Sequence, residues 1–410
     1  MRAYERMLKY VVVRTPSLEN QDCVPSTACQ FDLAKILVEE LKELGVENAF
    51  VDDKCYVYGS LPATPGYEDR TKLGLSAHID TIWDFRDKPV VPRVIENFDG
   101  QDFTLGDSGL VLSAKDFPML PSLKGRTLIC TDGNTELGAD DKAGIAEIMT
   151  VLERVQKENI PHGPIHVAFT PDEEIGLGPA NFSVEKFGAE IAYTLDGGRE
   201  GQVQYECFNA CKALFDIKGV NVHPGASKDI MINAGLIAME INDMLPTQTP
   251  RNTEGYEGFF HLMSMDSEVS HAHMYYTVRD FDKASFNCRK ATLRHIEKVL
   301  NEKWGEGTVT LTLVDQYPNM ADVIAGCMHM IDNAKEACRR AGVEPIIEPV
   351  RGGTDGAQYC YMGLPCPNLG TGGYGFHGPY EHITAEGMDI MTDIALELVK
   401  IYADRKSEKL

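Results

Sequence analysis

The stretch Gly74-Leu75-Ser76-Ala77-His78-Ile79-Asp80-Thr81 decides the fold of this chain. An apolar run, typical of a buried strand, ends here in a histidine and an aspartate that are two residues apart. Residues i and i+2 of a strand point to the same face, and open α/β sheets bind ligands at the carboxyl ends of their strands. The stretch therefore predicts a strand that presents His78 and Asp80 at a ligand site.

Four later segments repeat this arrangement, because each places a carboxylate or an imidazole after an apolar run or in a glycine-rich turn. These segments are Ala139-Asp140-Asp141-Lys142, Pro171-Asp172-Glu173-Glu174, Leu195-Asp196-Gly197 and Gly375-Phe376-His377-Gly378. Taken singly, such residues are more often helix caps or solvated turn residues. Five positions at five strand or loop ends together indicate the ligand set of a two-metal hydrolase.

Length and composition limit the class of protein. A chain of 410 residues with 43% hydrophobic content predicts a globular enzyme with two domains, or one large domain with an insertion. The net charge of -23 argues against nucleic-acid binding, which needs a basic surface. The 11 cysteines lack a paired Cys-x-x-Cys spacing and fit free thiols in a reducing cytosol. Because neither a signal peptide nor a membrane span is indicated, we expect a cytoplasmic protein without membrane partners.

The order of the expected elements divides the chain into three segments. Strands and helices alternate over 1–204 and again over 319–410, which predicts a mostly parallel α/β sheet with helices on both faces. Residues 205–318 follow a β-α-β-β-α-β order instead, typical of an α+β ferredoxin-like domain. We therefore predict a catalytic domain interrupted by an inserted domain. The long irregular stretch 83–124 is expected to be functional or to carry small elements.

The chemistry of the proposed ligands suits two zinc ions. Zinc binds histidine nitrogens and carboxylate oxygens, and a catalytic zinc keeps one position for water. Two ions about 3.5–4 Å apart need a bridging carboxylate and terminal ligands on each side. Asp140 suits the bridge. The terminal ligands are predicted to be His78 and Asp196 on one ion, and Glu174 and His377 on the other.

Two acidic neighbours of these ligands are predicted to act without binding metal. Asp80 is expected to fix the ring and the tautomer of His78. Glu173 lies beside the ligand Glu174 but should point elsewhere, which leaves it free to move a proton as general base.

The remaining histidines leave alternatives open at this point. His382 competes with His377, because five residues separate them in one loop. His271 and His273 are two residues apart on one predicted strand, and we interpret them as structural.

At these motifs the chain resembles the dinuclear zinc exopeptidases, a family that includes aminoacylases, glutamate carboxypeptidases and peptidase T. The likeness runs nearly end to end, and two strings outside the metal site are typical of the peptidase T branch. These strings are Thr253-Glu254-Gly255-Tyr256-Glu257-Gly258 and Arg351-Gly352-Gly353-Thr354-Asp355-Gly356. The family pattern His-Gly-x-x-Glu matches residues 377–381 and favours His377 over His382. The resemblance also implies that Asp140 bridges the zinc ions and that the Asp140–Asp141 peptide is cis.

The resemblance implies a zinc aminopeptidase that releases the N-terminal residue of tripeptides. A metal-bound water would attack the first peptide bond with Glu173 as general base. Alternatives with the same metal site are a dipeptidase, a carboxypeptidase or an N-acyl-amino-acid deacylase. The inserted domain is expected to be a lid, in which His223 polarises the scissile carbonyl and Arg279 binds the substrate carboxylate. Arg351, from the second catalytic segment, is a further candidate for binding that carboxylate. A homodimer is consistent with the resemblance, although no residue indicates it.

Overall fold

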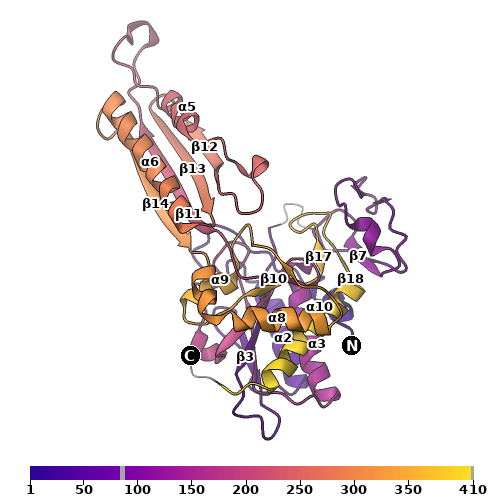
Figure 1. The fold of residues 1–410 in the computed structure, drawn as a ribbon. Helices are drawn as coiled ribbons and strands as arrows, with labels where there is room; N and C mark the ends of the chain where they lie inside the picture. Colours follow the sequence, from indigo (N-terminus) through magenta and orange to yellow (C-terminus); the bar gives the residue numbers. More distant parts are fainter. Residues whose placement is uncertain (84–87, 408–410) are drawn as a thin grey trace. The chain divides into compact units, whose positions relative to one another are not determined.

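The computed structural model describes residues 1–83 and 88–407, and the chain divides into two compact units. Residues 84–87, which belong to the stretch expected to be irregular, lie outside the described residues. Unit 1 comprises Met1–Tyr205, Asp322–Glu348 and Thr354–Leu410, and unit 2 comprises Glu206–Ala321 and Pro349–Gly353 (Figure 1). No helix among the described residues is both long and apolar enough to cross a membrane.

The main sheet of unit 1 has eight strands and is mixed. In spatial order they are β1 (Phe50–Val51), β2 (Val57–Leu61), β8 (Ile165–Thr170), β3 (Leu73–His78), β9 (Ile191–Leu195), β16 (Asn368–Leu369), β10 (Gln202–Gln204) and β15 (Ile346–Ile347). The centre, β8-β3-β9-β16, is parallel throughout. Antiparallel pairs join β1 to β2, β2 to β8 and β10 to β16. The predicted mostly parallel sheet is therefore parallel only at its centre and at the β10–β15 edge.

Helices cover both faces of this sheet. The helices are α1 (Ala3–Tyr10), α2 (Gln30–Glu43), α3 (Ala139–Lys157), α4 (Val184–Phe187), α7 (Ala321–Ile324), α8 (His329–Arg340), α9 (Asp355–Tyr361) and α10 (Ala385–Ala403), with 3-10 turns η1 (Leu120–Leu123) and η4 (Ala325–Cys327). Successive residues of β9 show the two faces. Ala192 packs in a cluster with Tyr359 of α9, whereas the Tyr193 hydroxyl hydrogen-bonds the Met330 carbonyl of α8. Alternation along a strand places these neighbours on opposite faces.

Unit 1 has a second sheet and a separate two-stranded pair, which include the small strands of the stretch expected to be irregular. The strands of this sheet are β17 (Gly373–Tyr374), β18 (His382–Thr384), β7 (Leu128–Thr131) and β4 (Pro92–Ile95), and β5 (Phe103–Thr104) pairs separately with β6 (Val111–Leu112). Buried apolar side chains around Phe98, Leu105 and Leu120 pack with β7. The stretch therefore carries small elements with a core of their own, as expected.

Unit 2 is a four-stranded antiparallel sheet with two helices on one face. The order along the sheet is β12 (Phe259–Ser267), β13 (His271–Asp280), β11 (Asn209–Lys218) and β14 (Val309–Tyr317), and the helices are α5 (Ala234–Met244) and α6 (Lys283–Trp304). Short 3-10 turns lie at η2 (Pro224–Ala226) and η3 (Pro250–Asn252). Alternate residues of β11, such as Phe215 and Ile217, pack against both helices. The intervening residues of β11 form the other, exposed face.

Candidate functional site

The structure of unit 1 brings all five predicted ligands together. His78 ends β3, Asp196 directly follows β9, and Glu174 lies just beyond β8. Because β8, β3 and β9 run parallel, their carboxyl ends meet at one edge of the sheet. Asp140 joins this group from the start of α3, and His377 joins it from the loop between β17 and β18.

Asp140 lies between the two imidazoles, with one oxygen toward each. Its Oδ1 is 3.1 Å from His78 Nε2, and its Oδ2 is 3.2 Å from His377 Nε2. His78 Nε2 is also 3.6 Å from Asp196 Oδ1, and His377 Nε2 is 3.0 Å from Glu174 Oε2. Asp140 is therefore shared by two groups of donors, one with His78 and Asp196 and the other with His377 and Glu174. The Asp140–Asp141 peptide is cis, as the resemblance implies.

Asp80 supports the site through two different groups. Its backbone oxygen is 2.8 Å from His78 Nδ1, whereas its carboxylate is 3.5 Å from that nitrogen. The carboxylate instead accepts the backbone N–H groups of Glu173 at 2.9 Å and Glu174 at 3.2 Å. Asp80 therefore orients the His78 ring mainly by its carbonyl and holds the loop after β8 by its side chain.

Three further carboxylates order the site, and sequence reasoning assigned them no part in it. Glu381 accepts the backbone N–H groups of Leu137, Gly138 and Asp140 at 2.7–2.8 Å. Asp172 accepts hydrogen bonds from Ser26 and Gln30, which fixes the loop before Glu173. Asp141 Oδ2 accepts the backbone N–H of His78 at 3.0 Å. The His-Gly-x-x-Glu pattern contained the signal for Glu381, but nothing in local sequence shows which N–H groups it contacts.

Glu173 lies among acidic neighbours at the same sheet edge. Burial raises the pKa of its carboxyl well above the usual value, and the charge of Asp196 raises it further. Asp355, from the Arg-Gly-Gly-Thr-Asp-Gly string, is buried beside it and accepts the Thr170 hydroxyl at 2.6 Å. Burial raises the pKa of Asp355 to about 7.

The charges of the cluster favour a cation. Hydrogen bonds with Asp140 and Glu174 raise the pKa of His377 to about 11. Burial lowers the pKa of His78, but its hydrogen bonds with Asp140 and Asp196 outweigh burial and leave that pKa well above its usual value. The carboxylates thus draw protons onto the imidazole nitrogens, and a divalent metal competes for the same lone pairs.

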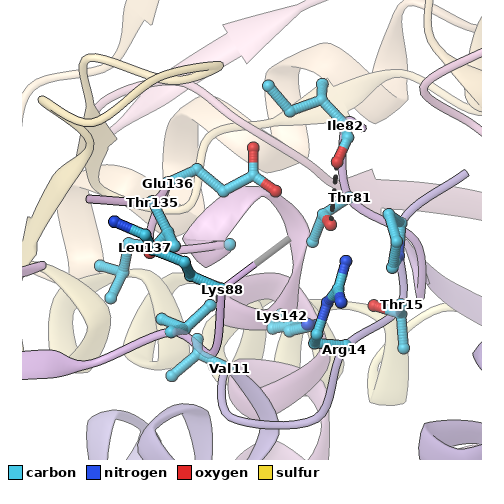
Figure 2. Close-up of a pocket in the computed structure, with 13 residues that line it drawn as sticks. Val11, Arg14, Thr15, Thr81, Ile82, Lys88, Thr135, Glu136, Leu137 and Lys142 are labelled. Carbon is cyan, nitrogen blue, oxygen red and sulfur yellow. Dashed lines mark hydrogen bonds between the residues drawn. The ribbon is translucent and has the colours of Figure 1, made fainter. Parts of the chain in front are cut away.

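A small pocket is lined by residues that adjoin the site segments, among them Thr81 and Gly138 (Figure 2). Its lining includes the cationic side chains of Arg14, Lys88 and Lys142 and the acidic side chain of Glu136. Lys142 Nζ donates to the Val13 carbonyl at 2.8 Å, and burial lowers its pKa to about 8. None of the five predicted ligands lines this pocket.

His382 lies apart from the five donors. Its Nδ1 is 2.8 Å from the Tyr380 carbonyl, and its ring packs edge-to-face against Phe117. The structure therefore brings His377, and not His382, to Asp140 and Glu174.

The three predicted substrate-binding residues all belong to unit 2. His223 is exposed and caps η2, where its Nδ1 accepts the Gly225 N–H at 3.1 Å. Arg279 donates to Gln316 Oε1 at 2.9 Å and lies over the Tyr317 ring. The role of His223 at the scissile carbonyl stays a prediction, because the contact seen here is the cap on η2.

Arg351, which begins one of the two peptidase T-like strings, contacts the loop that carries the other, residues 253–258. Its guanidinium donates to the carbonyl oxygens of Gly255 at 2.6 Å and Glu257 at 3.1 Å, and to the Thr253 hydroxyl at 3.1 Å. These contacts show Arg351 ordering residues 253–257. Its role as a carboxylate anchor stays a prediction.

Comparisons with known proteins identify the family of the chain. A model of the peptidase family M20/M25/M40 matches residues 138–401. A peptidase T of Clostridium perfringens is 50% identical over 406 residues, covering 98% of this chain and 100% of that protein. A peptidase T of Bacillus licheniformis is 49% identical over 404 residues, covering 98% of each.

A solved structure shows the same fold. The aminopeptidase PepT from Bacillus cereus superposes with a TM-score of 0.78 at 22% identity, covering 98% of each chain. At 22% identity this likeness shows a shared fold alone. Membership of a family rests instead on the family model and on the relatives that are about 50% identical. This chain therefore belongs to the peptidase family M20/M25/M40 and is, within it, a peptide hydrolase similar to the peptidase T enzymes.

Proposed function

We propose that this chain is a zinc-dependent aminopeptidase that releases the N-terminal residue of tripeptides. The observation that carries the proposal is the position of Asp140, whose two oxygens lie 3.1 Å and 3.2 Å from the Nε2 atoms of His78 and His377. A carboxylate placed between two imidazoles is what a bridging ligand of two metal ions requires.

The donor geometry supports two zinc ions. Two donors about 2.0–2.1 Å from one tetrahedral zinc are about 3.3 Å apart. The distances from His78 to Asp140 and Asp196, and from His377 to Asp140 and Glu174, are 3.0–3.6 Å. Glu174 Oε1 is buried without a hydrogen-bond partner among the described residues, and such an atom is costly unless something binds it. We assign His78, Asp140 and Asp196 to one ion, and His377, Asp140 and Glu174 to the other.

Glu173 is proposed to be the general base. Bound zinc would supply a Lewis acid that polarises the scissile carbonyl and lowers the pKa of water. Glu173 then takes a proton from the attacking water and delivers it to the leaving amine. Asp80 is a positioning residue, because its carboxylate holds the backbone of Glu173 and Glu174.

Substrate recognition is proposed from the resemblance. His223 would donate to the developing oxyanion, and the Arg279 guanidinium would bind the C-terminal carboxylate, with Arg351 as a second candidate. The carboxylate-rich surroundings of the metals suit a free ammonium group. Anchors for both charged ends of a peptide would select its length, because an unpaired, desolvated charge commonly costs about 2–5 kcal/mol.

Unit 2 is proposed to be an inserted, ferredoxin-like domain that acts as a lid. Its β-α-β-β-α-β order and its strand order β12-β13-β11-β14 support the ferredoxin-like assignment. A homodimer is compatible with this arrangement. We also propose a cytoplasmic location, which the 11 free cysteines favour.

The test is hydrolysis of a matched set of di-, tri- and tetrapeptides, with an N-acetylated and a C-amidated tripeptide, and with the products identified. We expect the tripeptide to lose its N-terminal residue, and each blocking group to lower kcat/KM strongly. Equal cleavage of the acetylated tripeptide would identify a deacylase, and release of the C-terminal residue first would identify a carboxypeptidase. Preferred cleavage of dipeptides would identify a dipeptidase.

A further inference from the structure

The exposed face of the unit 2 sheet carries a second group of metal-binding side chains. His271 and His273 are two residues apart on β13, and Asp216 lies on the adjacent strand β11, directly opposite His273 in the register. The intervening residue Ala272 is buried in the core on the other face. Strand alternation therefore points all three polar side chains away from α5 and α6, where water and ions reach them.

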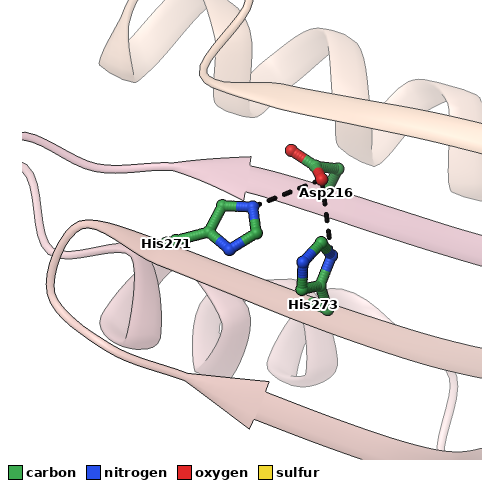
Figure 3. A group of neighbouring side chains, drawn as sticks. All are labelled: Asp216, His271 and His273. Carbon is green, nitrogen blue, oxygen red and sulfur yellow. Dashed lines mark hydrogen bonds and ion pairs between the residues drawn. The ribbon is translucent and has the colours of Figure 1, made fainter.

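The three side chains converge on one point. Asp216 Oδ2 is 3.3 Å from His271 Nε2 and 3.3 Å from His273 Nδ1 (Figure 3). The two rings pack edge-to-face, with centroids 4.0 Å apart. One ligand atom from each residue lies within 4.8 Å of the others. Donors of a single tetrahedral zinc are about 3.3 Å apart, so the two carboxylate contacts already match the spacing that a shared ion requires.

We propose that Asp216, His271 and His273 form a metal site for a borderline divalent cation such as Zn²⁺, separate from the candidate catalytic centre. Two imidazoles and one carboxylate form the nitrogen and oxygen set that zinc and its neighbours prefer. Without a cation, a single carboxylate oxygen can be shared by both rings only if each ring carries a proton on the facing nitrogen. A bound cation takes the place of these two hydrogen bonds: each neutral ring then carries its proton on the other nitrogen, and the cation pairs with the carboxylate charge.

The site is open on its solvent side. The exposed fractions of the Asp216, His271 and His273 side chains are 41%, 41% and 57%. Water therefore completes the coordination. Asp266 on β12 is opposite His273 on its other side, and directly opposed residues of antiparallel strands share a face. Its carboxylate is available to bind the ion as a further oxygen donor, or to accept a hydrogen bond from one of the ligands.

The effect of this site would be to join the two central strands of the unit 2 sheet. His271 and His273 belong to β13 and Asp216 belongs to β11, so one ion would link residues that are more than 50 positions apart in the chain. A cation that binds the folded chain alone stabilises it by mass action. The site therefore makes the stability of unit 2 depend on free zinc.

The experiment is a zinc titration of the full-length protein after its metals have been removed by chelation. Binding is followed by calorimetry, and bound zinc is counted by elemental analysis after gel filtration. The His271→Ala/His273→Ala variant should bind one zinc equivalent fewer than the wild type. The control variant, His261→Ala/His295→Ala, removes two exposed histidines of unit 2 that lie outside the cluster and should bind as many equivalents as the wild type.

Two further variants separate this site from the candidate catalytic centre. The His271→Ala/His273→Ala variant should keep wild-type peptide hydrolysis, whereas His78→Ala should lose hydrolysis and keep the extra zinc equivalent. Asp216→Asn, a milder change on an exposed strand position, should weaken binding of the extra equivalent at least about 10-fold. Equal zinc stoichiometry in the wild type, the double variant and Asp216→Asn would overturn the proposal and leave the proposed catalytic centre unaffected.

Discussion

Two clusters in this chain place histidines against carboxylates, and they differ in burial. In unit 1 the exposed side-chain fractions of His78, Asp140, Glu174 and Asp196 are 2–14%, and only His377, at 54%, is as exposed as the unit 2 residues. In unit 2 those of Asp216, His271 and His273 are 41–57%. The buried cluster is surrounded by carboxylates that hold backbone N–H groups, as Asp80 and Glu381 do. Buried polar atoms need such partners, whereas water satisfies exposed ones. The comparison teaches that an ordered surrounding network, beyond the donor set itself, distinguishes a centre built for chemistry.

The largest expected effect comes from removing metal at the buried cluster. Exhaustive chelation should abolish peptide hydrolysis, because both donor groups lose the ion that polarises the substrate, and added zinc should restore it. The His271→Ala/His273→Ala variant should respond identically, since its exposed cluster takes no part in hydrolysis. Fully active protein with only trace metal would contradict the assignment.

The next effect tests the base beside the buried cluster. Glu173→Ala should lower kcat by about 10²–10⁴-fold, the typical contribution of general acid–base catalysis, while both centre metals remain bound. Elemental analysis and steady-state kinetics measure the two results together. Glu185→Ala, which removes an exposed carboxylate at the start of α4, serves as control. A Glu173→Ala enzyme with near-normal kcat would end the general-base assignment.

A smaller effect is expected where the surrounding network is weakened. Asp80→Asn keeps the size of the side chain but loses the charge that accepts the N–H groups of Glu173 and Glu174. Loss of such a supporting group typically costs about 10–100-fold in metal affinity or activity. Asp216→Asn at the exposed cluster should leave kcat unchanged. If Asp80→Asn also left kcat and metal affinity unchanged, the network would be dispensable.

The smallest effect is expected on the free energy of unfolding, compared between one variant of each region in zinc-free protein. Asp172→Ala leaves buried donors of Ser26 and Gln30 unpaired, so we expect the free energy of unfolding to fall by about 2–5 kcal/mol. Asp216→Ala removes an exposed side chain and should change it by less than about 0.5 kcal/mol. Urea unfolding of both variants measures the difference. Equal losses of unfolding free energy in the two variants would show that burial does not make one carboxylate more important for stability than the other.

The helices and strands near the site follow closely from local pattern. The apolar spacing predicts a helix over 385–403, and α10 spans Ala385–Ala403. The sequence also predicts a helix over 322–341, but the structure divides this segment into α7, η4 and α8. Periodicity registers a continuous apolar face, but it does not detect a short 3-10 segment inside that face. The parallel sheet centre was predictable because buried strands alternate with helices, whereas the antiparallel β1–β2 and β10–β16 pairs each include a strand of only two residues.

The sequence by itself determined which residue types end the central strands, and therefore the nitrogen and oxygen donors available at one sheet edge. Only the tertiary structure decided which atoms meet. The carbonyl of Asp80, rather than its carboxylate, is the nearer partner of His78 Nδ1, and Glu381 holds residues more than 240 positions away. Asp216 meets His273 only through the register of β11 with β13. Local periodicity sets the face of a side chain, but strand register and loop contacts arise between distant segments, and no local pattern encodes them.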